Sequence, residues 1–223
     1  MSFTRRRSSQ IAEGPLSPSI IPDLALLPKP LNNTAIPVGQ LVSKTTNYDP
    51  SMLEDRDYDD IGTKWYKDVI IFDSKSHRFL ESLGAAHLVQ KQPEEGTEVG
   101  TIEAESQHVR LLKDADAALK KALEDEKAQS WLKENKEAGF VVATREVLNA
   151  SYKRARLVDI GAGNYEVRRE VGHEGQQGGK RRDSGLDVQT SSKTDLVGVV
   201  VREIIEKDGA YALGDELEAS FWQ

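Results

Sequence analysis

The clearest alternation of apolar and polar residues lies in the second half of the chain, at residues 164–171. Tyr165, Val167 and Val171 fall on one side of this segment, and mostly charged side chains fall on the other. A period of two places successive side chains on opposite faces, so the pattern predicts a half-buried strand. Arg169 is the residue that interrupts the apolar side.

Further segments of this half are rich in β-branched residues. Residues 140–148, 153–160 and 194–205 are therefore predicted to be strands. Residues 172–185 contain five glycines together with a basic cluster, which predicts a mobile basic loop. The pattern of residues 210–222 fits either a helix or a final strand.

A different period occurs at residues 106–136. Leu112, Leu119 and Trp131 belong to a series of apolar residues spaced by three and four, and Lys and Glu fill the remaining positions. This is the pattern of an amphipathic helix, and Gly139 suits its C-terminal end. One long charged helix is predicted here.

Proline marks the first part of the chain. All eight prolines lie at or before Pro93, and six lie between Pro15 and Pro37. Because proline lacks an amide donor, this part is predicted to be neither mostly helix nor a central strand. We expect an extended, Pro-rich arm at residues 1–34 and a single α+β domain at residues 35–223. The arm residues expected to dock on the domain are Ile20, Ile21, Leu24, Leu26 and Leu27.

The segments between the arm and the predicted helix are mixed. Residues 35–42 are predicted to be the first strand, and residues 48–60, with six carboxylates against one arginine, an acidic loop. Residues 64–72 are aromatic and β-branched, which favours a strand. Residues 76–90 have helical spacing, but Gly84 weakens the helix and leaves a strand as the alternative.

Composition narrows the class of protein. The chain has 223 residues, 38% of them hydrophobic and 30% charged, with a net charge of −7 and no cysteine. Disulfide scaffolds, thiolate zinc sites and cysteine nucleophiles are thereby excluded. No apolar run reaches the roughly 18–20 residues that a transmembrane helix needs, and no apolar block follows the basic start. We expect a soluble, cytoplasmic protein.

Motifs for catalysis are not found. Gly179 and Lys180 resemble part of a phosphate-binding loop, but Arg181 stands where a hydroxyl residue would hold magnesium. The four histidines fit no metal-ligand spacing, and there is no Gly-x-Ser-x-Gly elbow. The expectation is a protein that is not an enzyme and has no cofactor and no metal.

Basic residues cluster in the second half of the chain. Residues 140–182 carry nine basic and five acidic side chains in a chain that is acidic overall. This asymmetry predicts a face directed at an anionic partner, with a scattered solvated surface as the alternative. Acidic phospholipid is favoured over nucleic acid, because aromatic residues do not interleave with the cations. The candidate contact residues are Arg154, Arg156, Arg168, Arg169, Lys180, Arg181 and Arg182.

The order of these segments resembles that of a known family. A charged helix is followed by a strand at residues 140–148, moderately alternating strands, a glycine-rich loop and a strand at residues 195–204. This order is similar to the pore-forming domain of gasdermins. The short length, the Pro-rich opening and residues 36–42 are most similar to the short fungal regulator-of-cell-death branch. The resemblance implies a twisted antiparallel β-sheet flanked by helices.

The resemblance also implies a function. Such proteins bind acidic phospholipids, form homo-oligomers or hetero-oligomers with a related chain, and permeabilise the plasma membrane, which causes cell death. The inhibitory C-terminal domain of animal members has no counterpart here, which implies control by a partner chain or by assembly. A membrane-spanning strand needs only about 9–11 residues, and strands must close into a barrel. The candidate membrane-inserting residues are Tyr165, Val167, Val171, Leu196, Val197, Val199 and Val201.

Two other classes remain open at this point. The first is a non-lytic cytoplasmic interaction module that binds an acidic protein or RNA through the basic, glycine-rich loop. The second is an enzyme whose catalytic residues are scattered along the sequence. Leakage from vesicles distinguishes the pore-forming class from both.

Overall fold

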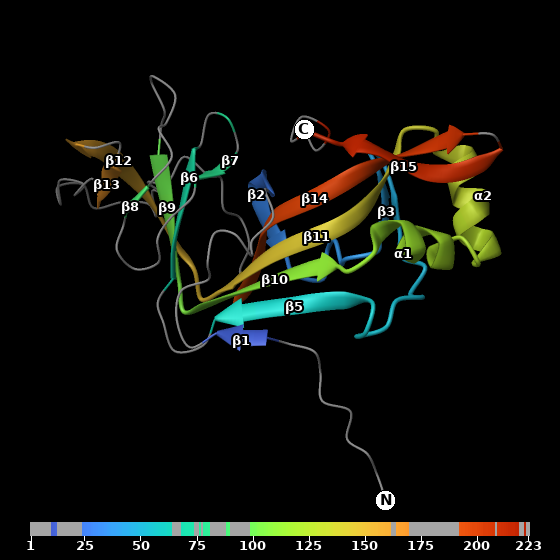
Figure 1. The fold of residues 1–223 in the computed structure, drawn as a ribbon, viewed down its shortest axis with the longest axis horizontal. Coiled ribbons are helices and arrows are strands. Elements are labelled where there is room, and N and C mark those ends of the chain that lie inside the picture. Colours follow the sequence, from blue (N-terminus) through green and yellow to red (C-terminus); the bar gives the residue numbers. More distant parts are fainter. Residues whose placement is uncertain are drawn as a thin grey trace, which may run out of the picture.

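The protein is described by a computed structural model. It describes residues 10–12, 24–63, 68–73, 76, 78–80, 88–89, 99–161, 164–169, 192–207, 209–218 and 221. Within these residues the chain forms one sheet of fifteen strands, almost wholly antiparallel, and two helices (Figure 1). The predicted fold class, α+β with a twisted antiparallel sheet flanked by helices, is confirmed.

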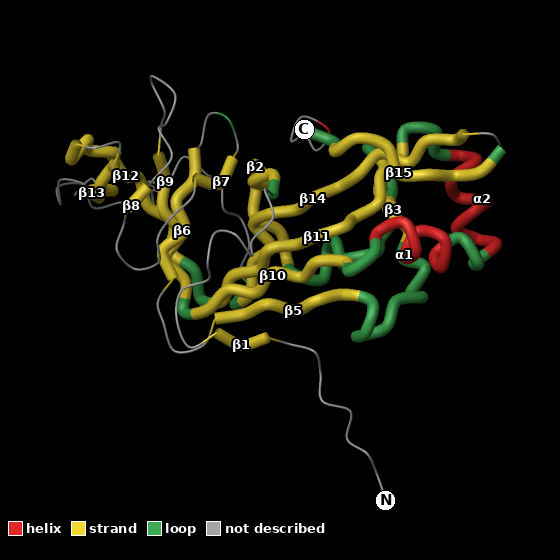
Figure 2. Tube along the Cα trace, in the orientation of Figure 1, coloured by secondary structure: helices red, strands yellow, loops and turns green. Residues whose placement is uncertain are grey.

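The strands fall into two leaves of the sheet, joined by a sharp bend (Figures 1 and 2). The long leaf contains β5 (Tyr58–Thr63), β10 (Ser106–Leu112), β11 (Ala138–Leu148), β14 (Thr194–Lys207) and β15 (Ala210–Glu216). The second leaf contains β6 (Asp68–Asp73), β7 (Arg78–Leu80), β8 (Leu88–Val89), β9 (Val99–Ala104), β12 (Ser151–Gly161) and β13 (Asn164–Arg169). Shorter strands at the margins and between the leaves are β1 (Gln10–Ala12), β2 (Ala25–Asn32), β3 (Leu41–Ser43) and β4 (Asn47–Tyr48).

Two chain segments cross the bend. β9 continues into β10 through Glu105, and β11 continues into β12 through Asn149 and Ala150, so the same antiparallel ribbon belongs to both leaves. Asn149 has a φ of 49°, a left-handed conformation that asparagine tolerates better than most residues. Its Nδ2 donates to Glu105 Oε2 at 2.6 Å, and the Glu105 amide donates to the Leu148 carbonyl at 2.9 Å. The bend is thus fixed by local hydrogen bonds.

Four apolar clusters stabilise this arrangement, and three of them form the main cores. The largest lies beneath the helices and includes Leu119, Leu132 and Phe140. A second fills the inside of the bend, where Phe72 and Ile102 of one leaf meet Val197 of the other. The third covers the opposite face of the long leaf. Burial on both faces explains why β11 and β14, in the middle of this leaf, have nearly continuous apolar runs.

The helical region differs from the single helix that was predicted. Residues 106–112 form strand β10, and the helical part is divided into α1 (Ala115–Ala122) and α2 (Glu126–Glu134). Each helix has an aspartate N-cap: Asp114 accepts from the Ala117 amide and Asp125 accepts from the Lys127 amide. The N-cap at Asp125 starts a second helix, although the apolar spacing by itself predicts that the first helix continues through this point.

The expectation that the Pro-rich part contains no central strand is wrong, because β2 lies between β14 and β7 inside the sheet. β2 contains Pro28 and Pro30, yet its pairing with β14 shifts register between Leu26 and Leu31. The prolines lie within that irregularity, where the ladder does not need their missing amides. Leu24, Leu26 and Leu27 are buried as expected, whereas Ile20 and Ile21 lie outside the described residues. The boundary between arm and domain stays a prediction.

Other segments are confirmed or corrected strand by strand. The strands predicted at residues 140–148, 153–160, 164–171 and 194–205 correspond to β11 to β14. The acidic segment 48–60 is only partly a loop, because β5 begins at Tyr58. The strand predicted at residues 35–42 begins only at Leu41, with β3, and residues 35–40 form turns and bends before it. Within residues 76–90, β7 and β8 confirm the strand alternative. Residues 210–222 were predicted to form either a helix or a strand, and the structure shows strand β15 at Ala210–Glu216.

Candidate functional site

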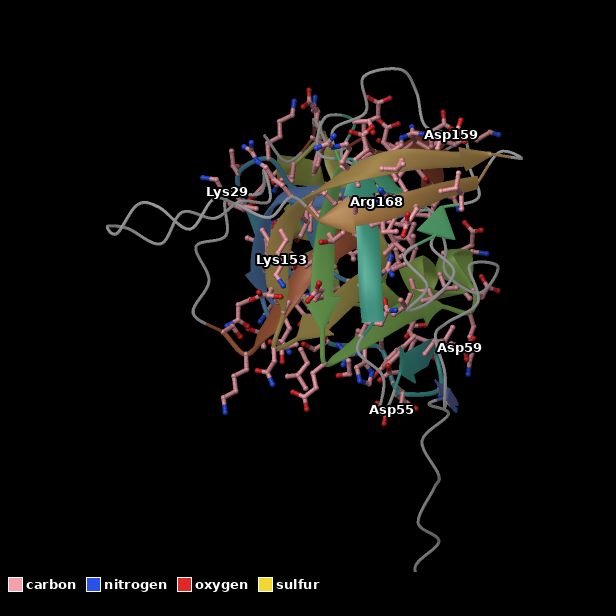
Figure 3. The ribbon with its side chains drawn as sticks, turned by 90° about the vertical axis from the view of Figure 1, so that its left-hand side faces the viewer. Lys29, Asp55, Asp59, Lys153, Asp159 and Arg168 are labelled. Atoms are coloured by element: carbon pink, nitrogen blue, oxygen red, sulfur yellow. The ribbon has the colours of Figure 1, made fainter. Side chains whose placement is uncertain are left out.

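The candidate site is the hairpin formed by β12 and β13 at one end of the sheet (Figure 3). The pairing sets Arg156 directly opposite Arg168, and Val158 opposite Glu166. Gly161, at a φ of 90°, begins the turn, and its amide donates to Asp159 Oδ1 at 2.7 Å. Glycine suits this position because a positive φ strains other residues.

One face of the hairpin carries arginine. Arg154 and Arg156 are two residues apart on β12, and Arg168 pairs with Arg156, so the three share a face. All three are exposed. Glu166, on the same strand, accepts from Arg168 at 2.8–2.9 Å, and the bridge joins two exposed groups. Like charges directly opposite in a sheet are destabilising, so the pair Arg156–Arg168 favours any anion that binds over it.

The other face of the hairpin packs on the protein. Ala155 is buried with Ile71 and Val99, and Leu157 packs against this small cluster. On the same face of β12, Lys153 Nζ lies 3.1 Å from Glu103 Oε2. The hairpin therefore displays arginine on one side and packs Ala155 and Leu157 against the protein on the other.

The sequence-predicted contact residues are only partly brought together. Arg154, Arg156 and Arg168 form the exposed face, which we call the arginine face. Arg169 pairs with Ala155, which sets it at the register of the opposite face. Lys180, Arg181 and Arg182 lie outside the described residues. Their participation stays a prediction.

The residues predicted to insert into a membrane occupy different environments. Tyr165 and Val167 pair with Asp159 and Leu157 in the hairpin, and Val171 lies outside the described residues. The four candidates on β14 are all buried in the core, and they are Leu196, Val197, Val199 and Val201. Leu196, Val199 and Val201 belong to one apolar cluster and Val197 to another, so both faces of β14 are covered in this structure.

A second group of charges was not anticipated from the sequence. His108 Nδ1 lies 3.1 Å from Asp60 Oδ1, and Arg110 bridges Asp60 at 3.6 Å and also pairs with the buried Glu146. Hydrogen bonding from His108 holds the pKa of Asp60 below its ordinary value, whereas burial raises the pKa of Glu146. His108 and Arg110 are two residues apart on β10, and this spacing is the one sequence signal that could have placed them on a common face.

A third polar group lies inside the bend. Arg145 is 6% exposed, and its Nε and Nη2 both donate to Gln107 Oε1, at 2.9 and 2.7 Å. Its guanidinium lies 4.6 Å from the ring centroid of Phe79 on β7. Gly198 faces this stack from β14. β7 pairs with β2 at only one position, Arg78 with Ala25. The contact between Arg145 and Phe79 therefore helps to hold β7 against the long leaf.

The described residues contain no group of three or more His, Cys, Asp or Glu side chains that could hold a metal ion. No helix among them has the length and apolar character to cross a membrane.

The fold and site define a class of protein: an α+β chain with a bent antiparallel sheet whose end hairpin displays a cationic face. Among solved structures, the chain is similar to a bacterial gasdermin from Bradyrhizobium tropiciagri, at 12% sequence identity and a TM-score of 0.34, over 88% of this chain and 90% of that chain. A likeness of this size does not assign the chain to that family. The sequence matches no protein-family model and no curated protein. The similarity to the fungal branch stays a prediction.

Proposed function

We propose that this protein binds membranes containing acidic phospholipid and assembles there into a pore, with the β12–β13 hairpin as the first inserted element. The observation that carries the proposal is the arginine face, which gathers Arg154, Arg156 and Arg168 on the exposed side of a hairpin at the end of the sheet. The gasdermin-like order of the sequence supports the same function. On this proposal the protein moves from the cytoplasm to the plasma membrane, and permeabilisation causes cell death.

Electrostatics explains the binding step. A basic residue near an anionic leaflet contributes about 1 kcal/mol, so the three arginines together contribute about 3 kcal/mol. A guanidinium binds a phosphate with two parallel hydrogen bonds, which lysine does not provide. A phosphate placed between Arg156 and Arg168 also relieves their repulsion. Acidic headgroups are therefore better suited to this face than neutral ones.

Geometry explains why insertion begins with this hairpin. β12 has 11 residues, which matches the length that a tilted membrane strand needs. The cluster under it has three buried residues, whereas Leu196 to Val201 of β14 lie in cores on both faces. Removing each large aliphatic side chain from such a core costs about 1.5–3 kcal/mol. β14 would then insert only after assembly, because in lipid the backbone hydrogen bonds of a strand are all satisfied only in a closed barrel.

The arginine face constrains the pore. An arginine facing lipid at the bilayer midplane costs about 2–4 kcal/mol, so the arginine face must point to a water-filled lumen or to the interface. On the opposite face, Ala155 and Leu157 would point to lipid, while Lys153, Asp159 and Arg169, which share its register, would have to lie at the interface. One hairpin cannot close a barrel, so the active form is an oligomer, of this chain or with a related chain.

Dye-filled vesicles test the proposal. Vesicles with 30% phosphatidylserine should leak, and phosphatidylcholine vesicles should not. Replacing Arg154, Arg156 and Arg168 with glutamine should weaken binding about 100-fold. The matched control replaces three exposed lysines elsewhere with glutamine, namely Lys120, Lys127 and Lys207.

Three results would overturn the proposal. The first is equal leakage from neutral and acidic vesicles. The second is no leakage from acidic vesicles even with a related chain added. The third is a salt-sensitive complex with RNA or an acidic protein that depends on the arginine face while vesicles stay intact, which would establish the non-lytic interaction module instead.

A further inference from the structure

An exposed apolar side chain lies close to the turn of the β12–β13 hairpin. Ile160 is 52% exposed, and among the described residues it is the one large apolar side chain that is exposed rather than half-buried. Figure 3 shows Asp159, its neighbour on β12, at the margin of the molecule. One exposed isoleucine is ordinary on a protein surface, so the meaning of Ile160 depends on the groups around it.

The backbone at Ile160 departs from the regular ladder. Asp159 pairs with Tyr165 and Gly161 pairs with Asn164, so Ile160 is the additional residue of a β-bulge. The Gly161 amide donates to Asp159 Oδ1 at 2.7 Å, and this hydrogen bond spans Ile160. The exposed position of the isoleucine is therefore fixed by the local backbone, since bulges re-aim a side chain.

The cations on the same strand suit an anionic surface. Arg154 and Arg156 are exposed, and neither has an ion-pair partner in the described part of the chain. Arg168, by contrast, already bridges Glu166. At about 3.3 Å per residue, Arg156 lies about 13 Å and Arg154 about 20 Å from Ile160 along β12.

These spacings fit a hairpin that meets a membrane with its end first. Membrane strands are tilted by about 45°, and the headgroup layer on each side of a bilayer is about 5–8 Å thick. With Ile160 at the edge of the hydrocarbon, this tilt places the Arg156 backbone about 9 Å and the Arg154 backbone about 14 Å further out. A long arginine side chain extends back toward the phosphates, so both guanidinium groups reach the headgroup layer.

We infer that the hairpin docks end first on a leaflet of acidic phospholipid, with Ile160 entering the boundary between headgroups and acyl chains and Arg154 and Arg156 binding phosphates. The inference rests on the proposed function and names the contact that precedes insertion. Apolar burial and attraction to anionic lipid are the two contributions that bind a protein element at a membrane interface. Cations alone would suit any polyanion, whereas the added apolar side chain suits a membrane.

A fluorescent label tests the orientation. The chain has no cysteine, so Ile160→Cys provides a single site for an NBD label. The matched control is Ser151→Cys, an exposed site at the start of β12, about 30 Å from Ile160 along the strand. On phosphatidylserine vesicles, the label at 160 should shift to shorter wavelength and become protected from an aqueous quencher, and the label at 151 should do neither. Equal changes at both sites, or a label at 160 that stays in water on bound protein, would overturn the inference.

Substitution at position 160 tests the apolar contribution. Ile160→Thr keeps the β-branched shape and removes most of the apolar surface, so binding to these vesicles should weaken about fivefold. This loss should be the same at low and high ionic strength, whereas the loss from Arg154→Gln should shrink as salt screens the charge. The matched control is Ile205→Thr, because Ile205 pairs with Ala212 of β15, at the other end of the molecule from β12 and β13 (Figure 1). No loss at position 160, or a loss that disappears at high salt, contradicts the apolar contact.

Asp159 gives an independent test with the opposite sign. It is exposed beside Ile160, and its charge opposes an acidic leaflet. Asp159→Asn keeps an oxygen that accepts from the Gly161 amide and removes the charge, so binding should tighten about fivefold. Unchanged binding would show that this end of the hairpin does not approach the leaflet.

Failure of this inference and failure of the pore give different results. Leakage with the label at 160 in water refutes the end-first contact and leaves the pore, whereas a buried label without leakage refutes the pore and leaves the contact. Absence of binding to acidic vesicles refutes both. Self-association without lipid that Ile160→Thr abolishes would assign this side chain to a contact between copies instead.

Discussion

The stack of Arg145 on Phe79 makes a prediction that can be measured in detail. Phe79 lies on β7, and Arg145 is buried on β11, so the contact joins the two leaves across the bend. Replacing Phe79 with leucine keeps an apolar side chain at this position and removes the aromatic face. Replacing Arg145 with methionine removes the charge and keeps a long side chain.

The magnitude follows from burial. A desolvated cation–π contact contributes about 1–2 kcal/mol, more than the 0.5–1 kcal/mol typical of exposed pairs. Phe79→Leu should therefore lower the free energy of unfolding by about 1.5 kcal/mol, which at about 2 kcal/mol per molar urea lowers the urea midpoint by about 0.7 M. Phe79→Ala should cost about 3 kcal/mol, because it also leaves a cavity.

A double-mutant cycle isolates the contact. Arg145→Met leaves Gln107 Oε1 without its two guanidinium donors, but this loss occurs with or without the ring and cancels in the cycle. Urea unfolding of the wild type, the two single variants and the double variant should give a coupling of at least 1 kcal/mol, by the cation–π magnitude. A coupling below about 0.4 kcal/mol would lie within the deviation from additivity expected of independent sites, and it would show that the stack does not hold the two leaves together.

Three further predictions concern the bend, the core and pH. Asn149→Ala should cost about 1–2 kcal/mol of stability through its positive φ and its lost bond to Glu105, while Asn149→Gly should cost clearly less; thermal melts that rank them otherwise contradict the account of the bend. Gly100→Ala should destabilise by about 1–3 kcal/mol, because its Cβ would lie 2.1 Å from Phe72 Cζ, and adding Phe72→Leu should recover part of the loss. Asp60 has a lowered pKa, so its charge stabilises the fold above the ordinary value of 3.8 and this stabilisation is lost on acidification. Asp60→Asn should then cost about 1 kcal/mol at pH 7 and progressively less as the pH falls through the lowered pKa of Asp60; a cost that stays the same on acidification would contradict it.

The second half of the chain could be predicted from the sequence because local preference and tertiary pairing agree there. Strands β11, β13 and β14 have β-branched or alternating residues, and each was expected within a few positions. β5 and β10 were missed for a different reason. β5 contains Asp59 and Asp60, and β10 has an apolar spacing that continues into α1. Only tertiary pairing decides that they are strands, because β10 pairs with β11 and β5 pairs with β10.

The candidate site was predictable in part. Spacing by two places Arg154 and Arg156 on one face of any strand. That Arg168 joins them depends on the pairing register of β12 with β13, which no local pattern reveals. The arginine stack on Phe79 depends on contacts between β7 and β11, which are far apart in the sequence, and could not be found from spacing.

The bend decides how the hairpin can move. β12 is continuous with β11, and its partner β9 is continuous with β10, so the hairpin cannot leave the sheet without moving the ribbon that also runs through the long leaf. If the bend straightened, β9 to β12 would become a single long ribbon, with β11 and β12 reaching from Ala138 to Gly161. The local restraints against this are the hydrogen bonds of Glu105 and Asn149, and the apolar cluster inside the angle. Since that cluster is shared by Phe72, Ile102 and Val197 of both leaves, it is the larger barrier, and a membrane could offset its loss by covering the same side chains with lipid.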